Sequence, residues 1–136
     1  MSQSKLFLDS LSAARKIGES RDCAVRAVSI AARVPYDVAH SLLSQKGRRP
    51  GRGTHDWQYL GVLKDLGFSV IDETKKYRNK GGKTVTSLSK LLPSRGVFII
   101  RVRGHVACYR AGEIHDWMDP SRRNHIRDVW RISKTG

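Results

Sequence analysis

The pattern of apolar residues changes at Pro93, and this change limits the possible folds more than any other feature of the sequence. Before Pro93, apolar residues recur at spacings of three and four, which is typical of amphipathic helices. After Pro93 come short runs of β-branched and aromatic residues separated by Gly, Pro and Arg, which is typical of strands. Helices followed by strands predict an α+β fold, and 136 residues fit a single domain, residues 1–136.

Four helices are expected before Pro93, and a brief fifth helix is expected next to it. The second helix consists of small apolar residues on nearly all sides, as expected of a helix buried in the middle of a domain, with Asp22 or Ser20 as its N-cap. Thr54 is the expected cap of the fourth helix, whose apolar face includes Trp57. The expected helices span residues 4–17, 23–32, 35–47, 54–67 and 86–92.

The strands are expected to form an antiparallel sheet, because most of them follow one another at short spacings with turn residues between them. A short strand before Pro93 is a further candidate. The expected strands span residues 68–71, 97–102, 105–109, 113–117 and 126–132.

The chain is strongly basic, because 26 Lys and Arg face 12 Asp and Glu, for a net charge of +14. Residues 1–74 carry +3 and residues 75–136 carry +11. Two stretches with Gly or Pro, 46–52 and 75–83, are predicted to be basic loops, which either bind a nucleic acid or an acidic protein surface or are simply solvated. The candidate residues for binding a substrate or partner are Arg48, Arg49, Arg52, Arg122 and Arg123.

No apolar run approaches the roughly 20 residues of a transmembrane helix, so no membrane association is expected. The segment Met1–Lys5 is polar and begins no visible secretion signal. Two cysteines cannot build a disulfide scaffold, and no closely spaced Cys or His pair indicates a metal site. A cytoplasmic protein without metal or cofactor is expected.

Cys23 falls on the first turn of the predicted buried helix. The unpaired N–H groups and the positive end of the helix dipole stabilise a thiolate there, which predicts a low thiol pKa. The neighbouring backbone amides could also face a developing oxyanion. The alternative for any buried cysteine is a small core residue, and this is the interpretation of Cys108.

His105 lies at the start of a predicted strand and can serve as a general base for Cys23. The adjoining strand offers two carboxylates that could orient its imidazole. If Ala111 and Gly112 form a two-residue loop, Asp116 shares the face of His105, whereas a three-residue loop brings Asp119 there. Asp116 is favoured, and Asp119 remains the alternative.

The neighbouring residues have simpler interpretations. His55 and Asp56 fall in the first turn of a predicted helix, where an acid interacts favourably with the dipole and needs no chemistry. Trp57 and Trp130 are interpreted as core anchors. Trp117 is either another anchor or a residue that binds substrate and shields the His–Asp pair from water.

Two segments carry a family resemblance, Asp22-Cys-Ala-Val-Arg-Ala-Val28 and Gly104-His-Val-Ala-Cys-Tyr-Arg-Ala-Gly-Glu-Ile-His-Asp116. They resemble papain-like cysteine peptidases, most of all the small bacteriocin leader-processing peptidases and uncharacterised phage and bacterial proteins of that type. The resemblance covers roughly residues 18–132. It implies a nucleophile on a central helix packed against an antiparallel sheet that bears His and then Asp or Asn.

The resemblance implies a Cys–His–Asp hydrolase that cleaves a peptide, isopeptide or related amide bond, in the host cytoplasm or the virion if the chain is phage-encoded. Family members have a Gln about six residues before the cysteine as an oxyanion donor, and Ile17 stands there in this chain. Ser20, Arg21 or the backbone is the candidate replacement, and Asp22 is a further candidate. The competing hypothesis is an inactive papain-like fold that acts as a basic binding or structural module for nucleic acid or an acidic protein.

Overall fold

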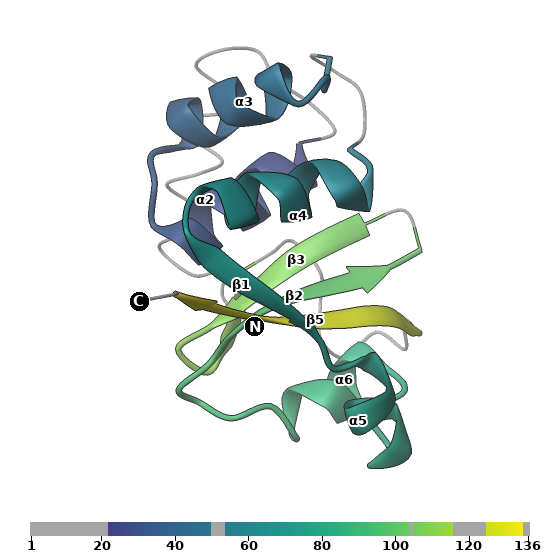
Figure 1. Ribbon diagram of the computed structural model, residues 1–136. Coiled ribbons are helices and arrows are strands. Elements are labelled where there is room, and N and C mark those ends of the chain that lie inside the picture. The colour runs from purple at the N-terminus through teal and green to yellow at the C-terminus, as the bar shows by residue number, and fades with distance from the viewer. Residues whose placement is uncertain (1–21, 50–53, 104, 116–124, 135–136) are drawn as a thin grey trace.

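The computed structural model describes residues 22–49, 54–103, 105–115 and 125–134, which form three layers (Figure 1). A five-stranded sheet lies in the middle, with α2, α3 and α4 on one face and α5 and α6 on the other. The elements are α2 (Cys23–Ala32), α3 (Tyr36–Gln45), α4 (Asp56–Asp65), β1 (Phe68–Asp72), α5 (Thr74–Asn79), α6 (Val85–Ser89), β2 (Val97–Val102), β3 (His105–Arg110), β4 (Glu113–His115) and β5 (Ile126–Lys134).

The sheet has the strand order β1-β5-β2-β3-β4, and all of its neighbouring strands are antiparallel. The predicted α+β fold is therefore confirmed: helices from the first part of the chain lie on an antiparallel sheet built mainly from the second part. The expected helix over residues 4–17 lies outside the described residues.

Alternation along the strands divides the apolar residues between the two faces, because successive side chains of a strand point to opposite sides. Ile99, Cys108 and Trp130 belong to the core under α2, α3 and α4. Phe98 precedes Ile99 on β2, and Val129 precedes Trp130 on β5. Both belong to the core under α5 and α6. Both faces of the sheet are thus covered, and the central strands are buried.

One prediction about the basic stretch 75–83 is wrong, because α5 (Thr74–Asn79) occupies its first half. Lys and Arg are good helix formers, and Tyr77 gives this short helix a buried anchor with its ring edge-on to Phe98. The carboxylate of Asp72 accepts hydrogen bonds from the N–H and the hydroxyl of Thr74, which fixes the helix start. The basic side chains therefore lie on an ordered surface.

The start of α4 also differs from the prediction. His55, and not Thr54, is the N-cap, and its N–H donates to Oε1 of Gln58 at 2.8 Å. The buried stripe includes Tyr59 and its neighbours one turn further on, whereas Trp57 is 61% exposed. The interpretation of Trp57 as a core residue is wrong.

The core interpretation of Trp130 is confirmed, since its side chain is only 6% exposed. None of the helices in the described part of the chain is long and apolar enough to cross a membrane.

Candidate active site

Cys23 is the first residue of α2, and its partly buried thiol faces the start of β3. The thiol is hydrogen-bonded to the side chain of His105 and to the backbone of Val106. The helix start places the sulfur near N–H groups that have no partner within the helix, and the first residue of β3 supplies the imidazole. Two segments about 80 residues apart thus meet at one sulfur atom.

Several opposing effects set the acidity of this thiol. Burial raises the pKa of Cys23, but the hydrogen bond and charge of His105, the backbone hydrogen bond of Val106 and the charge of Arg26 together hold that pKa below its usual value. The thiolate is the reactive form of cysteine, so this environment favours nucleophilic chemistry.

A buried ion pair lies directly behind the nucleophile. Nη1 of Arg26 and the hydroxyl of Tyr36 each donate to the carboxylate of Asp22 at 2.6 Å. Asp22 occupies the N-cap position, but its side chain forms no capping hydrogen bond. The predicted N-cap position of Asp22 is therefore confirmed, but its carboxylate is the counter-ion of Arg26 and makes no capping hydrogen bond. As an acceptor held in this pair, it supplies no donor for an oxyanion.

The thiol opens into a cavity of about 440 Å³. Three parts of the chain contribute to its wall: the start of α2, the turn region of β2 and β3, and the residues at the start of α4. The lining residues are Cys23, Thr54, His55, Asp56, Tyr59, Arg101, Val102, His105 and Val106.

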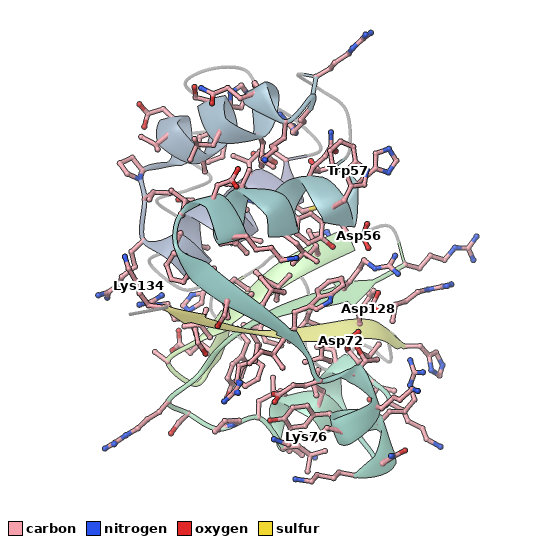
Figure 2. The ribbon with its side chains drawn as sticks, viewed as in Figure 1. Asp56, Trp57, Asp72, Lys76, Asp128 and Lys134 are labelled. Atoms are coloured by element: carbon pink, nitrogen blue, oxygen red, sulfur yellow. The ribbon has the colours of Figure 1, made fainter. Side chains whose placement is uncertain are left out.

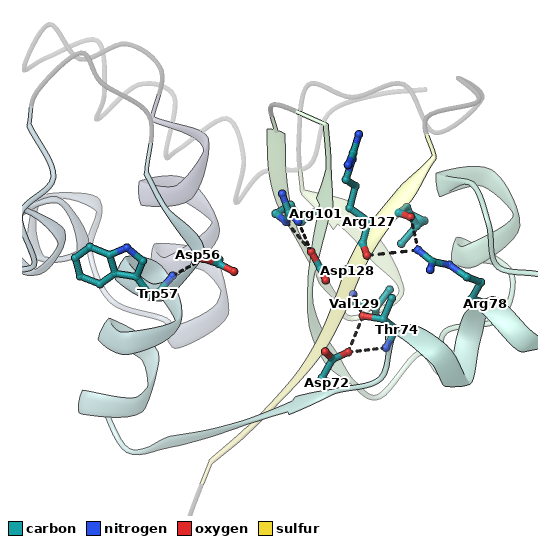
Figure 3. Close-up of polar contacts among 10 residues, drawn as sticks. Asp56, Trp57, Asp72, Thr74, Arg78, Arg101, Arg127, Asp128 and Val129 are labelled. Atoms are coloured by element: carbon teal, nitrogen blue, oxygen red, sulfur yellow. Dashed lines mark hydrogen bonds and ion pairs between the residues drawn. The ribbon is translucent and has the colours of Figure 1, made fainter.

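Two charged side chains that line this cavity, Asp56 and Arg101, have defined partners (Figure 3). Nε and Nη2 of Arg101 both lie 2.6 Å from Oδ2 of Asp128 on β5, so this guanidinium is held in place by an acid. Oδ1 of Asp56 accepts from the N–H of Trp57. The indole of Trp57 stacks on the ring of His55, with centroids 6.4 Å apart and planes 9° apart. Figure 2 shows Asp56 and Trp57 together at the end of α4.

Sequence reasoning missed the contribution of α4 to the site. His55 and Asp56 were expected only to start a helix, and Tyr59 was not singled out, yet all three line the cavity with Cys23. A possible signal was the mixture of hydroxyl, imidazole, carboxylate and indole groups in the four residues from Thr54 to Trp57.

The hairpin loop that decides between the two candidate aspartates has the predicted length. Arg110 pairs with Glu113, and the intervening Ala111 and Gly112 have φ values of 53° and 80°. Positive φ at both positions is typical of a type I′ turn, and Ala111 occupies the first of them although Gly or Asn is usual there. The two-residue loop is therefore confirmed.

Many of the predicted site residues cannot be compared with the structure. Arg49 is exposed, as expected of a binding residue, but Arg48 is only 3% exposed and its guanidinium belongs to the buried polar groups. Of these two candidate binding residues, only Arg49 lies at the surface. The residues that lie outside the described part of the chain are Ser20, Arg21, Arg52, Asp116, Trp117, Asp119, Arg122 and Arg123.

Cys108 confirms its interpretation as a core residue. Its side chain is fully buried in the middle of β3, and burial raises the pKa of its thiol to about 12. Within the described ranges, no group of three or more His, Cys, Asp or Glu side chains could hold a metal ion.

Comparison with known proteins finds no matching family model, no matching curated protein and no matching solved structure. The function must therefore be argued from the site itself.

Proposed function

We propose that the protein is a papain-like thiol hydrolase that cleaves a peptide, isopeptide or related amide bond. The observation that carries the proposal is the contact between the Cys23 thiol, at the start of a buried helix, and the His105 imidazole, with a thiol pKa held low in spite of burial. A structural cysteine needs no such partner, and Cys108 in the same chain has none of these features.

The proposed reaction follows from this contact. His105 takes the thiol proton, the sulfur attacks the carbonyl carbon, and the C–N bond breaks as the imidazolium returns the proton to the leaving amine. Water, deprotonated by His105, then attacks the thioester and releases the acid and the free thiol. The helix N-terminus and the cation of Arg26 favour the negative sulfur before attack.

Asp116 is kept as the third member of the proposed triad, with Asp119 as the alternative. The support is the loop at Ala111 and Gly112, which has two residues. A loop of this length is the one for which Asp116 was predicted to share the face of His105. The carboxylate would hold the imidazole in the tautomer that accepts the thiol proton.

The proposal is tested by the rate of Cys23 alkylation with iodoacetamide between pH 5 and pH 10. A thiol of lowered pKa stays ionised as the pH falls and loses its reactivity only when the pH passes through that lowered pKa. We expect the wild type to react at pH 6 at least about tenfold faster than His105→Ala. His125→Ala, which changes an exposed histidine, is the matched control.

If the midpoint of the wild-type profile equals that of a free cysteine, or if His105→Ala leaves the profile unchanged, the reactive-thiol proposal fails.

A second candidate function is binding of nucleic acid or an acidic protein by the basic surface of the sheet half. It is favoured by a cleft of about 490 Å³ lined by Arg78, Lys83, Arg101, His125, Ile126 and Arg127. The guanidinium of Arg78 donates to the backbone carbonyl groups of Ile126 and Arg127 (Figure 3). This fixes a cation at the wall of the cleft, where a phosphate or carboxylate would meet it.

This second function predicts a salt-dependent affinity for duplex DNA. The logarithm of the binding constant should fall as the logarithm of the salt concentration rises. In Arg127→Gln the magnitude of this slope should be smaller by about 1. Lys64→Gln, on α4, is the control. A slope near zero in the wild type would exclude the DNA-binding form of this function.

A further inference from the structure

Two residues that line the cavity beside Cys23 each carry a buried hydroxyl group that no described residue satisfies. Oη of Tyr59 and Oγ1 of Thr54 are both buried, and neither has a hydrogen-bond partner among the described residues. Both residues line the cavity. Buried hydroxyl groups without partners destabilise a fold, and each one in a native structure calls for an explanation, such as a catalytic role or a bound water or ion.

Tyr59 is the better-placed of the two donors. Its side chain is only 1% exposed, and its ring is fixed by edge-on contact with Trp130, with centroids 6.0 Å apart. The hydroxyl lies close enough to Cys23 for the negative sulfur to affect its acidity. Burial, followed by the charge of Asp56, raises the pKa of Tyr59, so the hydroxyl keeps its proton wherever Cys23 is active.

We propose that the Tyr59 hydroxyl is the oxyanion donor of the site, so that the cavity receives the carbonyl oxygen of an amide substrate. This inference rests on the proposed hydrolase function and adds a catalytic residue to it. When the Cys23 sulfur bonds to the carbonyl carbon, the electron pair of the C=O double bond moves to the oxygen. Tyr59 donates a hydrogen bond to that oxygen, and the C=O bond re-forms when the amine leaves.

A rigid donor suits this role, because a group that is already in place needs no reorganisation as charge develops. The edge contact with Trp130 and the position of Tyr59 on the buried side of α4 supply that rigidity. A substrate oxygen would also satisfy a hydroxyl that has no partner among the described residues.

Two reagents separate thiol reactivity from oxyanion stabilisation. Iodoacetamide alkylates the sulfur without forming an oxyanion, whereas acetylglycinal, a minimal aldehyde, adds to the sulfur and gives a tetrahedral carbon that bears the oxygen. The affinity of the aldehyde is measured by its protection of Cys23 against iodoacetamide, in the full chain.

In Tyr59→Phe we expect the aldehyde to bind about 10²-fold more weakly than in the wild type, with the iodoacetamide rate unchanged within about twofold. Tyr109→Phe is the matched control, because the Tyr109 hydroxyl donates to the carbonyl of Leu92 in the core on the other side of the sheet. The melting temperature of Tyr59→Phe should equal or exceed that of the wild type, since an unpaired buried hydroxyl is removed.

An activated thiol whose aldehyde affinity is the same in the wild type and in Tyr59→Phe overturns this assignment and leaves the hydrolase proposal intact. A wild-type thiol that reacts no faster than a free cysteine at pH 6 overturns both.

Discussion

The surroundings of the cavity beside α2 and the core under that helix each include one cysteine and one tryptophan, and these residues differ in acidity and exposure between the two regions. In the cavity region, Cys23 is partly buried with a lowered pKa, and Trp57 is 61% exposed. In the core, Cys108 is fully buried with a pKa raised to about 12, and Trp130 is 6% exposed. Residue type therefore says little about role here, because the surroundings decide both acidity and access.

The difference between the thiols comes from what replaces water around them. Cys108 lies among apolar side chains in the middle of a strand, and its burial outweighs the charge of Arg110, which alone favours the ionised thiol. Cys23 lies at a helix start beside an imidazole, a backbone hydrogen bond and a guanidinium, which together outweigh its burial. The two regions are separated by only a few residues along β3, between His105 and Cys108.

The largest expected effect is on alkylation of the native protein. At pH 8 we expect Cys23 to react with iodoacetamide at least about 10³-fold faster than Cys108, because Cys108 reacts only when the core opens, at a free-energy cost of several kcal/mol. Mass spectrometry of the labelled peptides measures both rates. In guanidinium chloride the two rates should become similar. If Cys23 of the native protein reacts less than about tenfold faster than Cys108, the two thiols do not differ in the way described.

The second effect is on stability. Trp130→Ala should lower the free energy of unfolding by about 3–5 kcal/mol, because it removes a buried indole that contacts Tyr59 in the core. Urea denaturation monitored by circular dichroism measures the change. A loss below about 1 kcal/mol would show that this part of the core is not packed as described.

The third effect is on alkaline stability. The folded-state pKa of Cys108 is raised, so its contribution to stability is complete below the unfolded pKa of about 8.5 and is lost as the pH rises toward about 12. This contributes a slope of about 1.4 kcal/mol per pH unit above pH 9, which Cys108→Ala should lack. Cys23→Ala should retain the slope, because a lowered pKa acts at lower pH. Equal slopes in the wild type and Cys108→Ala would contradict the burial of this thiol.

The smallest effect is expected at Trp57. Trp57→Ala should change the free energy of unfolding by no more than about 0.5 kcal/mol, since the indole is mostly in solvent and stacks only on His55. The same urea titration compares it directly with Trp130→Ala. A loss similar to that of Trp130→Ala would mean that the start of α4 is part of the core.

Local patterns predicted the elements well where each pattern depends on nearby residues. The helix at Cys23–Ala32 follows from its small apolar residues, and the strands around His105 follow from their β-branched and aromatic composition. The two-residue loop at Ala111 and Gly112 was predicted for the same reason. The helix at Thr74–Asn79 was missed because its anchor, Tyr77, is buried by residues distant in the sequence, such as Phe98 on β2.

The sequence by itself determined the class of fold and the two residues on which the proposed chemistry depends, since a cysteine at a helix start and a histidine at a strand start are visible in local patterns. The tertiary structure alone decided that α4 brings Tyr59 to the cavity, and that Trp57 faces solvent. It also decided that Arg26 forms an ion pair with Asp22 close enough to Cys23 for its charge to lower the pKa of the thiol. These features depend on contacts between segments far apart in the chain, and the periodicity of one segment does not specify which other segment will cover it.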